Sequence, residues 1–240
     1  MSPRRLVPLL CAGLTAGLAA AESPRELAGE RAKVQAQFPA AFAAVADDPA
    51  LPRVLLVGDS ISIGYTVPVR ELLRGRANVH RVPDNGGPTT RGLQQLAEWL
   101  GSGRWDVIHF NFGLHDVARV RDGEVRTPPA DYERNLRELV TRLQATGARL
   151  VFATTTPVPD PLTTGPRRRD ADVLVCNEIA RRVMAGSGVP VNDLYAAVRP
   201  RLAEFQLPAN VHFTDPGSQF LARFVADAIA PRLPPAPSKP

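Results

Sequence analysis

A serine that directly follows a strand-like apolar run is the first residue whose type and position suggest chemistry. Ser60 lies in the GDSIS segment of residues 58–62, which follows the apolar run of residues 53–57. This order places a hydroxyl at the carboxyl end of a strand and near the start of a helix. The free N–H groups and the positive dipole end of a helix start suit a developing oxyanion. The alternative is that Ser60 only caps that helix, so catalysis would depend on a base elsewhere in the chain.

A histidine far along the chain is the candidate base. The sequence has four histidines, of which His80 and His109 lie within expected strands, where packed or rim positions are more typical. His212 lies in the segment ANVHFT of residues 209–214, a loop just before the last expected helix. Because that loop can fold back over the edge of a sheet, His212 can reach Ser60 and take its proton.

Alternating strand and helix segments must position these residues. The expected strands are residues 53–57, 79–82, 107–112, 150–154 and 189–191. The expected helices are residues 67–74, 89–100, 131–146, 172–185 and 216–229, and the last one is expected to face inward through Phe220, Leu221, Phe224, Val225 and Ile229. Such alternation with short links predicts a parallel sheet covered on both faces, with the site at the carboxyl ends of its strands.

Four short motifs, in this order, resemble those of the SGNH hydrolase family, also called the GDSL esterases and lipases. GDSIS at 58–62 matches the first block, NGGPTT at 85–90 the second, GLHD at 113–116 the third and ANVH at 209–212, followed by FTDPG, the fifth. The resemblance spans residues 53–229. It implies a three-layer α/β/α flavodoxin-like sandwich around a mostly parallel five-stranded sheet, and ester hydrolysis through an acyl-serine.

The resemblance also implies roles for particular residues. Ser60 would be the nucleophile and His212 the base, and the backbone N–H groups of Ser60 and Gly87 would hold the oxyanion. The asparagine that the family uses as a further oxyanion donor is His115 in this chain. A neutral imidazole can donate one N–H, so His115 is the expected replacement, or alternatively a second acid/base group. Asp116 in the same motif is expected to fix its loop by hydrogen bonds.

A second departure concerns the family's triad aspartate, which is Ala209 in this chain. His212 would then be oriented by Asn210 or by a backbone carbonyl, with Asp193 as a weaker substitute. A Ser-His dyad stays plausible because loss of the orienting acid weakens catalysis without abolishing it. Asp59, beside the serine, is expected to be structural.

An arginine run lies in a long loop on the expected active-site side of the sheet. Residues 157–170 follow the fourth expected strand and contain Arg167, Arg168 and Arg169. One interpretation is a solvated loop. The other is a clamp for an anionic substrate such as a uronic-acid polymer, since arginine forks pair well with carboxylates.

The start of the chain predicts export. Arg4 and Arg5 precede an apolar run over residues 6–20, and three alanines at 19–21 form a cleavage site of the A-x-A kind. The run is too short for a spanning helix, so we expect a signal peptide at 1–21, a periplasmic or secreted protein and no stable membrane anchor. We expect a helical extension at 22–50, the hydrolase domain at 51–231 and a Pro-rich disordered tail at 232–240. Cys176 then remains as the single cysteine, in a helix core.

Composition and missing motifs narrow the function further. Without the two leader arginines, 27 of the 29 basic residues remain against 24 acidic ones, a net charge of +3 that is too weak to predict nucleic-acid binding. The sequence has no G-x-S-x-G elbow, P-loop or C-x-x-C motif, and nothing in it implies a metal or an organic cofactor. The expected substrates are small acyl esters, with O-acetyl groups on carbohydrate favoured by family analogy. The alternatives are acyl transfer through the same serine, and a non-catalytic carbohydrate-binding pseudoenzyme, against which the retention of both Ser60 and His212 argues.

Overall fold

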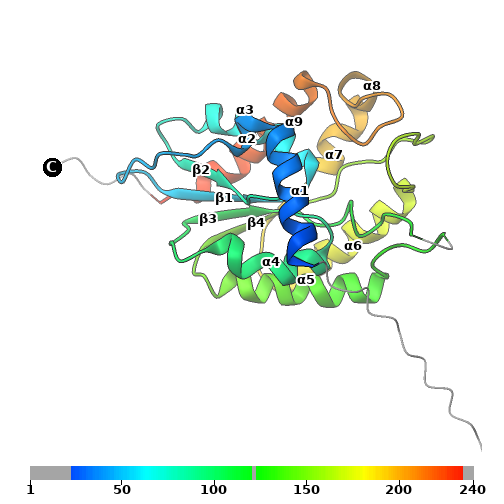
Figure 1. Ribbon diagram of the computed structural model, residues 1–240, viewed down its shortest axis with the longest axis horizontal. Coiled ribbons are helices and arrows are strands. Elements are labelled where there is room, and N and C mark those ends of the chain that lie inside the picture. Colours follow the sequence, from blue (N-terminus) through cyan, green and yellow to red (C-terminus); the bar gives the residue numbers. More distant parts are fainter. Residues whose placement is uncertain (1–22, 121–122, 235–240) are drawn as a thin grey trace, which may run out of the picture.

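A parallel sheet of five strands forms the centre of the computed structural model, which describes residues 23–120 and 123–234 (Figure 1). The strands lie side by side in the order β2-β1-β3-β4-β5. They are β1 (Arg53–Val57), β2 (Asn78–Arg81), β3 (Val107–Phe110), β4 (Arg149–Ala153) and β5 (Val191–Asn192). This is the strand order of flavodoxin-like, doubly wound sheets, in which ligands bind where the order reverses, here between β1 and β3. The predicted fold class is confirmed.

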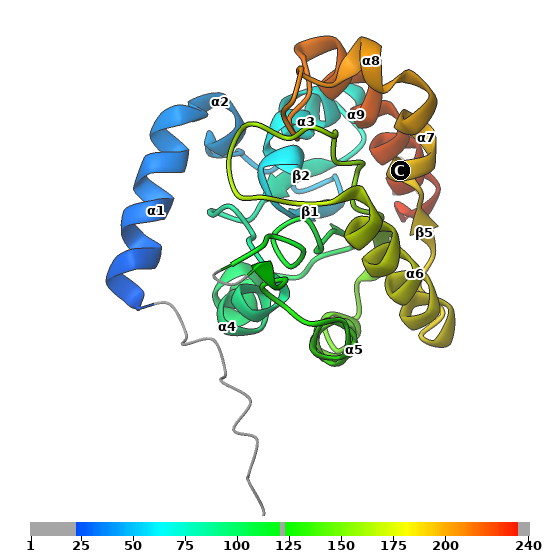
Figure 2. The ribbon, with the colours of Figure 1, turned by 90° about the vertical axis from the view of Figure 1, so that its right-hand side faces the viewer.

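Helices cover both faces of the sheet, because successive strand residues point to opposite sides. Leu55 and Val57 of β1 pack into one buried cluster, and Val54 and Leu56 pack into another. The first cluster lies under α4 (Thr89–Leu100), α5 (Pro129–Gln144) and α6 (Asp170–Gly186). The second lies under α3 (Ser60–Leu72) and α9 (Asp215–Ile229). Figure 2 shows α3 and α9 on one side of the sheet and α4 and α5 on the other.

The helix that follows β1 begins earlier than the sequence indicates. It starts at Ser60 rather than at residue 67, because the Asp59 side chain caps it by accepting a hydrogen bond from the Ile61 N–H at 2.9 Å. Gly64 and Pro68 weaken the helical pattern of this segment, yet both lie inside the helix. Gly64 allows a close approach of α9, since a Cβ atom there would lie 3.0 Å from the Ser218 hydroxyl.

Short helices that the sequence pattern does not reveal connect β5 to the His212 loop. They are α7 (Leu194–Val198), a 3-10 turn (Arg199–Arg201) and α8 (Leu202–Phe205), and a further 3-10 turn (Ala230–Arg232) follows α9. On α9, the expectation that Phe224 faces inward is wrong: Phe224 is 38% exposed, and its ring is tilted by 54° against the ring of Phe220. Cys176 is buried in α6.

Two helices, α1 (Pro24–Gln37) and α2 (Pro39–Phe42), precede the sheet in the segment expected to be a helical extension. Figure 2 shows α1 standing at the side of the sheet, beyond the edge formed by β2. Only Leu27 of α1 is buried, so α1 is held mainly by polar contacts. The Arg31 guanidinium binds both oxygens of the buried Asp84 carboxylate, at 2.7 and 2.9 Å. Arg91 of α4 forms an ion pair with Glu30 at 2.7 Å.

The predicted signal peptide at 1–21 and the greater part of the predicted tail lie outside the described residues, and the predicted domain boundaries stay predictions. Within the described part of the chain, no helix has the length and apolarity needed to cross a membrane.

Candidate active site

Ser60 lies at the carboxyl end of β1, as the first residue of α3. Asp59 holds an extended backbone conformation before it, and the buried Asp59 carboxylate is used as the helix cap. The carbonyl of Gly58 accepts hydrogen bonds from the Gly86 N–H at 3.0 Å and from the Arg81 guanidinium at 3.4 Å. The turn that presents Ser60 is therefore fixed by the neighbouring loop between β2 and α4.

The structure brings His212 to Ser60 from the far end of the chain. The Nε2 atom of His212 lies 2.9 Å from the Ser60 hydroxyl, and Nδ1 lies 2.8 Å from Oδ1 of Asn210. Because an amide oxygen only accepts hydrogen bonds, this contact places the imidazole proton on Nδ1. Nε2 is then free to accept the proton of Ser60, which is the arrangement a general base requires.

The loop that carries His212 is tied down at several points. The Leu207 N–H donates to the His212 carbonyl at 2.9 Å, and Gln206 forms a β-bridge with Phe213. The Gln206 side chain donates to the Pro157 carbonyl at 2.9 Å, which anchors the loop beside β4. The hydrogen bond to Ser60 thus joins a helix start to a loop that is itself anchored.

No carboxylate among the described residues is hydrogen-bonded to the His212 ring. Ala209, at the position where the resemblance implies an aspartate, has a left-handed backbone with φ of 50°. The Asp193 carboxylate is bonded to other groups: it accepts from Arg181 at 2.7 Å and from Thr154 at 2.9 Å, and it caps α7. Of the alternatives left open by the sequence, the geometry favours Asn210 as the group that orients the ring.

Partial desolvation lowers the pKa of His212 below its usual value of 6.5. The nearby Arg168 lowers this pKa further, while the buried Asp59 acts in the opposite sense. His212 is therefore uncharged at neutral pH and available as a base. Burial raises the pKa of Asp59, and the nearby Arg168 and His212 act in the opposite sense.

His115 lies in the loop after β3, close enough to His212 and Arg168 for their charges to act on it. Its side chain is partly buried and makes no hydrogen bond to any described residue. Burial, together with the charges of Arg168, Arg126 and Arg91, lowers the pKa of His115 to about 3. The ring is therefore neutral and has one N–H to donate, as an oxyanion donor needs.

Gly87 lies in the loop between β2 and α4, and the loop requires glycine at two positions. Gly87 has a φ of 65°, a conformation that other residues rarely adopt. A Cβ atom at Gly86 would lie 2.9 Å from the Gly58 carbonyl oxygen, too close for any other residue. The Gly87 N–H makes only a long contact of 3.4 Å, with the Asn85 side chain.

Asp116 is buried and joins two of the loops. Its carboxylate accepts the Thr89 hydroxyl at 2.6 Å and the Thr89 N–H at 3.0 Å, at the start of α4. Burial raises the pKa of Asp116 to about 6, and the bonds from Thr89 oppose that rise. These contacts suit the expected structural role, because they hold the His115 loop against the Gly87 loop.

Of the three consecutive arginines, only Arg168 turns towards the site. Its Nε donates to the Leu114 carbonyl at 2.7 Å, while Arg167 and Arg169 are exposed. Two further arginines near the site carry no signal in the sequence. Arg81, inside β2, is buried and donates to the Ser62 hydroxyl at 3.2 Å. Arg126 precedes α5 in a segment without any motif, and only the folded chain brings this segment to the His115 loop, where the Arg126 N–H donates to the Ala118 carbonyl at 2.7 Å.

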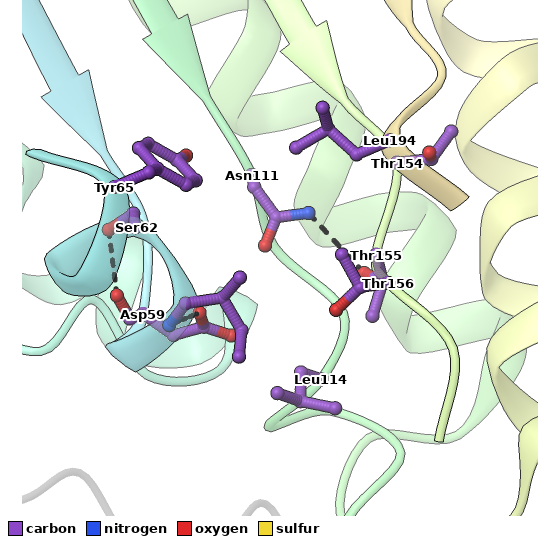
Figure 3. Close-up of a pocket in the computed structure, with 10 residues that line it drawn as sticks. Asp59, Ser62, Tyr65, Asn111, Leu114, Thr154, Thr155, Thr156 and Leu194 are labelled. Carbon is purple, nitrogen blue, oxygen red and sulfur yellow. Dashed lines mark hydrogen bonds between the residues drawn. The ribbon is translucent and has the colours of Figure 1, made fainter. Parts of the chain in front are cut away.

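A small cavity lies behind the start of α3, between the ends of β1, β3 and β4 (Figure 3). Its polar lining comes from Asp59, Ser62, Asn111 and Thr154–Thr156. The Asn111 amide, which Figure 3 shows pointing towards β4, donates to the Ala153 carbonyl at 2.8 Å. The cavity has a volume of about 10 Å³, which suits one water molecule. Within residues 23–120 and 123–234, no cluster of His, Cys, Asp and Glu side chains could hold a metal ion.

Comparison with known proteins identifies the class. The model of the GDSL-like lipase/acylhydrolase family matches residues 56–220. The chain belongs to this family, whose members hydrolyse ester bonds. No protein of curated function matches the sequence.

Solved structures share the fold. A lipase/acylhydrolase from Enterococcus faecalis has a TM-score of 0.65 at 22% identity, over 78% of this chain and 100% of that one. The acetyl xylan esterase AlAXEase has a TM-score of 0.63 at 18% identity, over 74% and 99%. Axe2, an acetylxylan esterase from Geobacillus stearothermophilus, has a TM-score of 0.62 at 18% identity, over 74% and 94%.

Proposed function

We propose that this protein is an exported serine esterase that removes small acyl groups, in particular O-acetyl groups, from carbohydrate. The observation that carries the proposal is the 2.9 Å contact between Nε2 of His212 and the Ser60 hydroxyl, with Nδ1 of the same ring on Asn210. Two solved structures of similar fold bear the name acetyl xylan esterase, which supports an acetylated carbohydrate as substrate.

The first half of the reaction acylates the serine. His212 takes the proton of Ser60 as the Ser60 oxygen bonds to the ester carbonyl carbon. The negative charge that develops on the carbonyl oxygen is held by the backbone N–H groups of Ser60 and Gly87 and by the neutral His115 ring. When the carbon–oxygen bond to the sugar breaks, His212 returns its proton to the leaving oxygen.

The second half releases the acid. A water molecule gives a proton to His212 and attacks the acyl carbon, and the same groups hold the second oxyanion. The bond to Ser60 breaks, His212 returns the proton to the Ser60 oxygen, and acetic acid leaves. Asn210 acts throughout by holding the His212 ring, and Asp59 and Asp116 act by fixing the two loops.

The test compares acetate release from p-nitrophenyl acetate, acetylated xylan and acetylated pectin by the wild type and by Ser60→Ala and His212→Ala. The matched control is Ser102→Ala, an exposed serine remote from the motifs. We expect both site variants to lose at least a thousandfold in kcat while the control keeps its rate. A Ser60→Ala protein as active as the wild type would overturn the nucleophile assignment. Acetyl transfer to an added sugar in preference to water would instead make the protein an acyltransferase.

A further inference from the structure

The arginine turned towards the site is held in place by backbone groups of the His115 loop. Arg168 Nε donates to the Leu114 carbonyl at 2.7 Å, and Nη1 donates to the Pro166 carbonyl at 3.2 Å. Leu114 directly precedes His115, so the partly buried guanidinium lies over the loop that is proposed to hold the oxyanion. Because carbonyl partners leave the positive charge of Arg168 uncompensated, the charge acts on its surroundings.

A second arginine is held next to the same loop. The Arg126 N–H donates to the Ala118 carbonyl at 2.7 Å, and the N–H of the next residue, Thr127, donates to the Asp116 carbonyl at 3.0 Å. The segment with Arg126 therefore runs alongside the segment with His115. The Arg126 side chain is partly buried, and its guanidinium makes no hydrogen bond or ion pair with a described residue.

The segments that carry Arg126 and Arg168 lie side by side. Arg119 forms a β-bridge with Val125, and the Arg119 N–H donates to the Arg167 carbonyl at 2.8 Å. In keeping with this placement, Arg126 lowers the pKa of Arg168, and both lower the pKa of His115. Other arginines nearby are compensated: Arg91 pairs with Glu30 at 2.7 Å, and Arg119 pairs with Asp172 at 2.5 Å.

The acids closest to the site are not paired with these two arginines. The Asp59 carboxylate is buried at the start of α3 and attracts Arg168 only through space. The Asp116 carboxylate is turned towards Thr89. Two partly buried like charges without a carboxylate between them raise the energy of the empty site, and an anion bound between them would lower it.

We propose that Arg126 and Arg168 form a subsite for a carboxylate, and that the acylated carbohydrate this enzyme acts on contains uronic acid. The guanidinium fork matches a carboxylate in shape and charge, whereas a neutral sugar would leave both arginines uncompensated. Since both arginines flank His115, the carboxylate lies on the acylated sugar or on one next to it. This inference rests on the proposed function for its substrate, but the subsite itself is a binding property.

The first test is binding, which does not depend on hydrolysis. The wild type is titrated calorimetrically with de-esterified galacturonic-acid oligosaccharide and, as the neutral counterpart, with xylo-oligosaccharide. We expect the acidic oligosaccharide to bind more tightly, and its binding to weaken about tenfold in Arg126→Gln and in raised salt. Arg126→Lys, which keeps the charge, should retain part of the affinity. The control Arg167→Gln removes an exposed arginine of the same run and should bind like the wild type.

The second test is selectivity, measured as the ratio of kcat/KM on acetylated pectin to kcat/KM on acetylated xylan. The ratio should fall about tenfold in Arg126→Gln, and it cancels any general loss of folded enzyme. Equal affinity of the wild type for acidic and neutral oligosaccharides, or an unchanged ratio in Arg126→Gln, would overturn the subsite. Arginine-dependent binding by a protein that hydrolyses no ester would overturn the proposed function and leave the subsite standing.

Discussion

The Nδ1 atom of His212 lies 2.8 Å from the Oδ1 atom of Asn210, two residues earlier in the same loop. The same amide oxygen also accepts the backbone N–H of His212 at 3.0 Å. A carboxylate in this position would both fix the tautomer and stabilise the imidazolium that forms during the reaction. The neutral amide of Asn210 fixes the tautomer but does not stabilise the imidazolium. The site therefore has the geometry of a catalytic triad without the negative charge of its carboxylate.

Changes at Asn210 should separate these two effects. Asn210→Ala removes the acceptor, and we expect kcat to fall ten- to a hundredfold because the ring loses its fixed tautomer. Asn210→Asp has the same shape and adds a negative charge, so it should raise both kcat and the pKa of His212. Rates on p-nitrophenyl acetate as a function of pH provide the measurement. A wild-type kcat in Asn210→Ala would show that Asn210 does not orient the His212 ring.

The dependence of the rate on pH should reflect the uncharged state of His212. The base must be unprotonated, so kcat/KM rises with pH and reaches half of its maximum below 6.5, because the pKa of His212 is lowered. Arg168 contributes to that lowering, so Arg168→Gln should move the acid limb to higher pH. Arg167→Gln is the control, and an acid limb above 6.5 in the wild type would contradict the environment described for His212.

The contact between α1 and the β2–α4 loop should be measurable as stability. Arg31→Ala leaves the buried Asp84 carboxylate with Trp99 Nε1, at 2.7 Å, as its remaining side-chain partner. We expect the free energy of unfolding to fall by about 2 kcal/mol, because a buried charge loses its counterion. Urea denaturation measures this, with the exposed Arg25→Ala of the same helix as control. Equal stability of the two variants would mean that α1 does not hold the loop.

His109, in the middle of the sheet, should make the fold sensitive to acid. Its ring is fully buried, Nδ1 has no partner among the described residues, and burial lowers its pKa to about 3. The unfolded chain takes up a proton at this histidine near pH 6.5, whereas the folded chain does so only near 3. The stability contributed by neutral His109 is therefore present above pH 6.5 and is lost as the pH falls through this window.

Replacing His109 isolates this contribution. In His109→Leu, the free energy of unfolding should depend on pH less steeply between 6.5 and 3, by about 1.4 kcal/mol per pH unit, the value for one proton. The comparison is differential, so the other titrating groups cancel. Urea denaturation at several pH values measures the slopes, and parallel slopes for the two proteins would show that His109 does not titrate as described.

The presence of the five strands and of the long amphipathic helices could be predicted because their signals are local. The helix at Thr89–Leu100 has the predicted bounds, since its apolar residues recur at helical spacing. The start of α3 could not be predicted in the same way, because Gly64 and Pro68 are locally unfavourable and are tolerated by packing against α9. The family motifs directed attention to Ser60, which begins α3 directly after β1, and to His212, which lies in the loop before α9.

What the sequence could not reveal depends on contacts between distant segments. Arg31 and Asp84 are 53 residues apart, and neither belongs to a motif. Arg126 stands in a segment with no periodicity, and this segment lies beside the one with Arg168 only because Arg119 pairs with Val125 and with the Arg167 carbonyl. The run of three arginines predicts positive charge in this loop. Which of the three guanidinium groups turns inward depends on the Leu114 carbonyl, which accepts from Arg168.

The two groups that share the hydrogen bond at the site are 152 residues apart, one in the first turn after β1 and one just before α9. The pair can therefore meet only when the segment before α9 has docked against the segment after β1. Contacts between residues so distant in the chain slow the folding of a domain, because the loop between them must close first. Enzyme activity should consequently be among the last signals to return after dilution from denaturant, behind the recovery of helical circular dichroism.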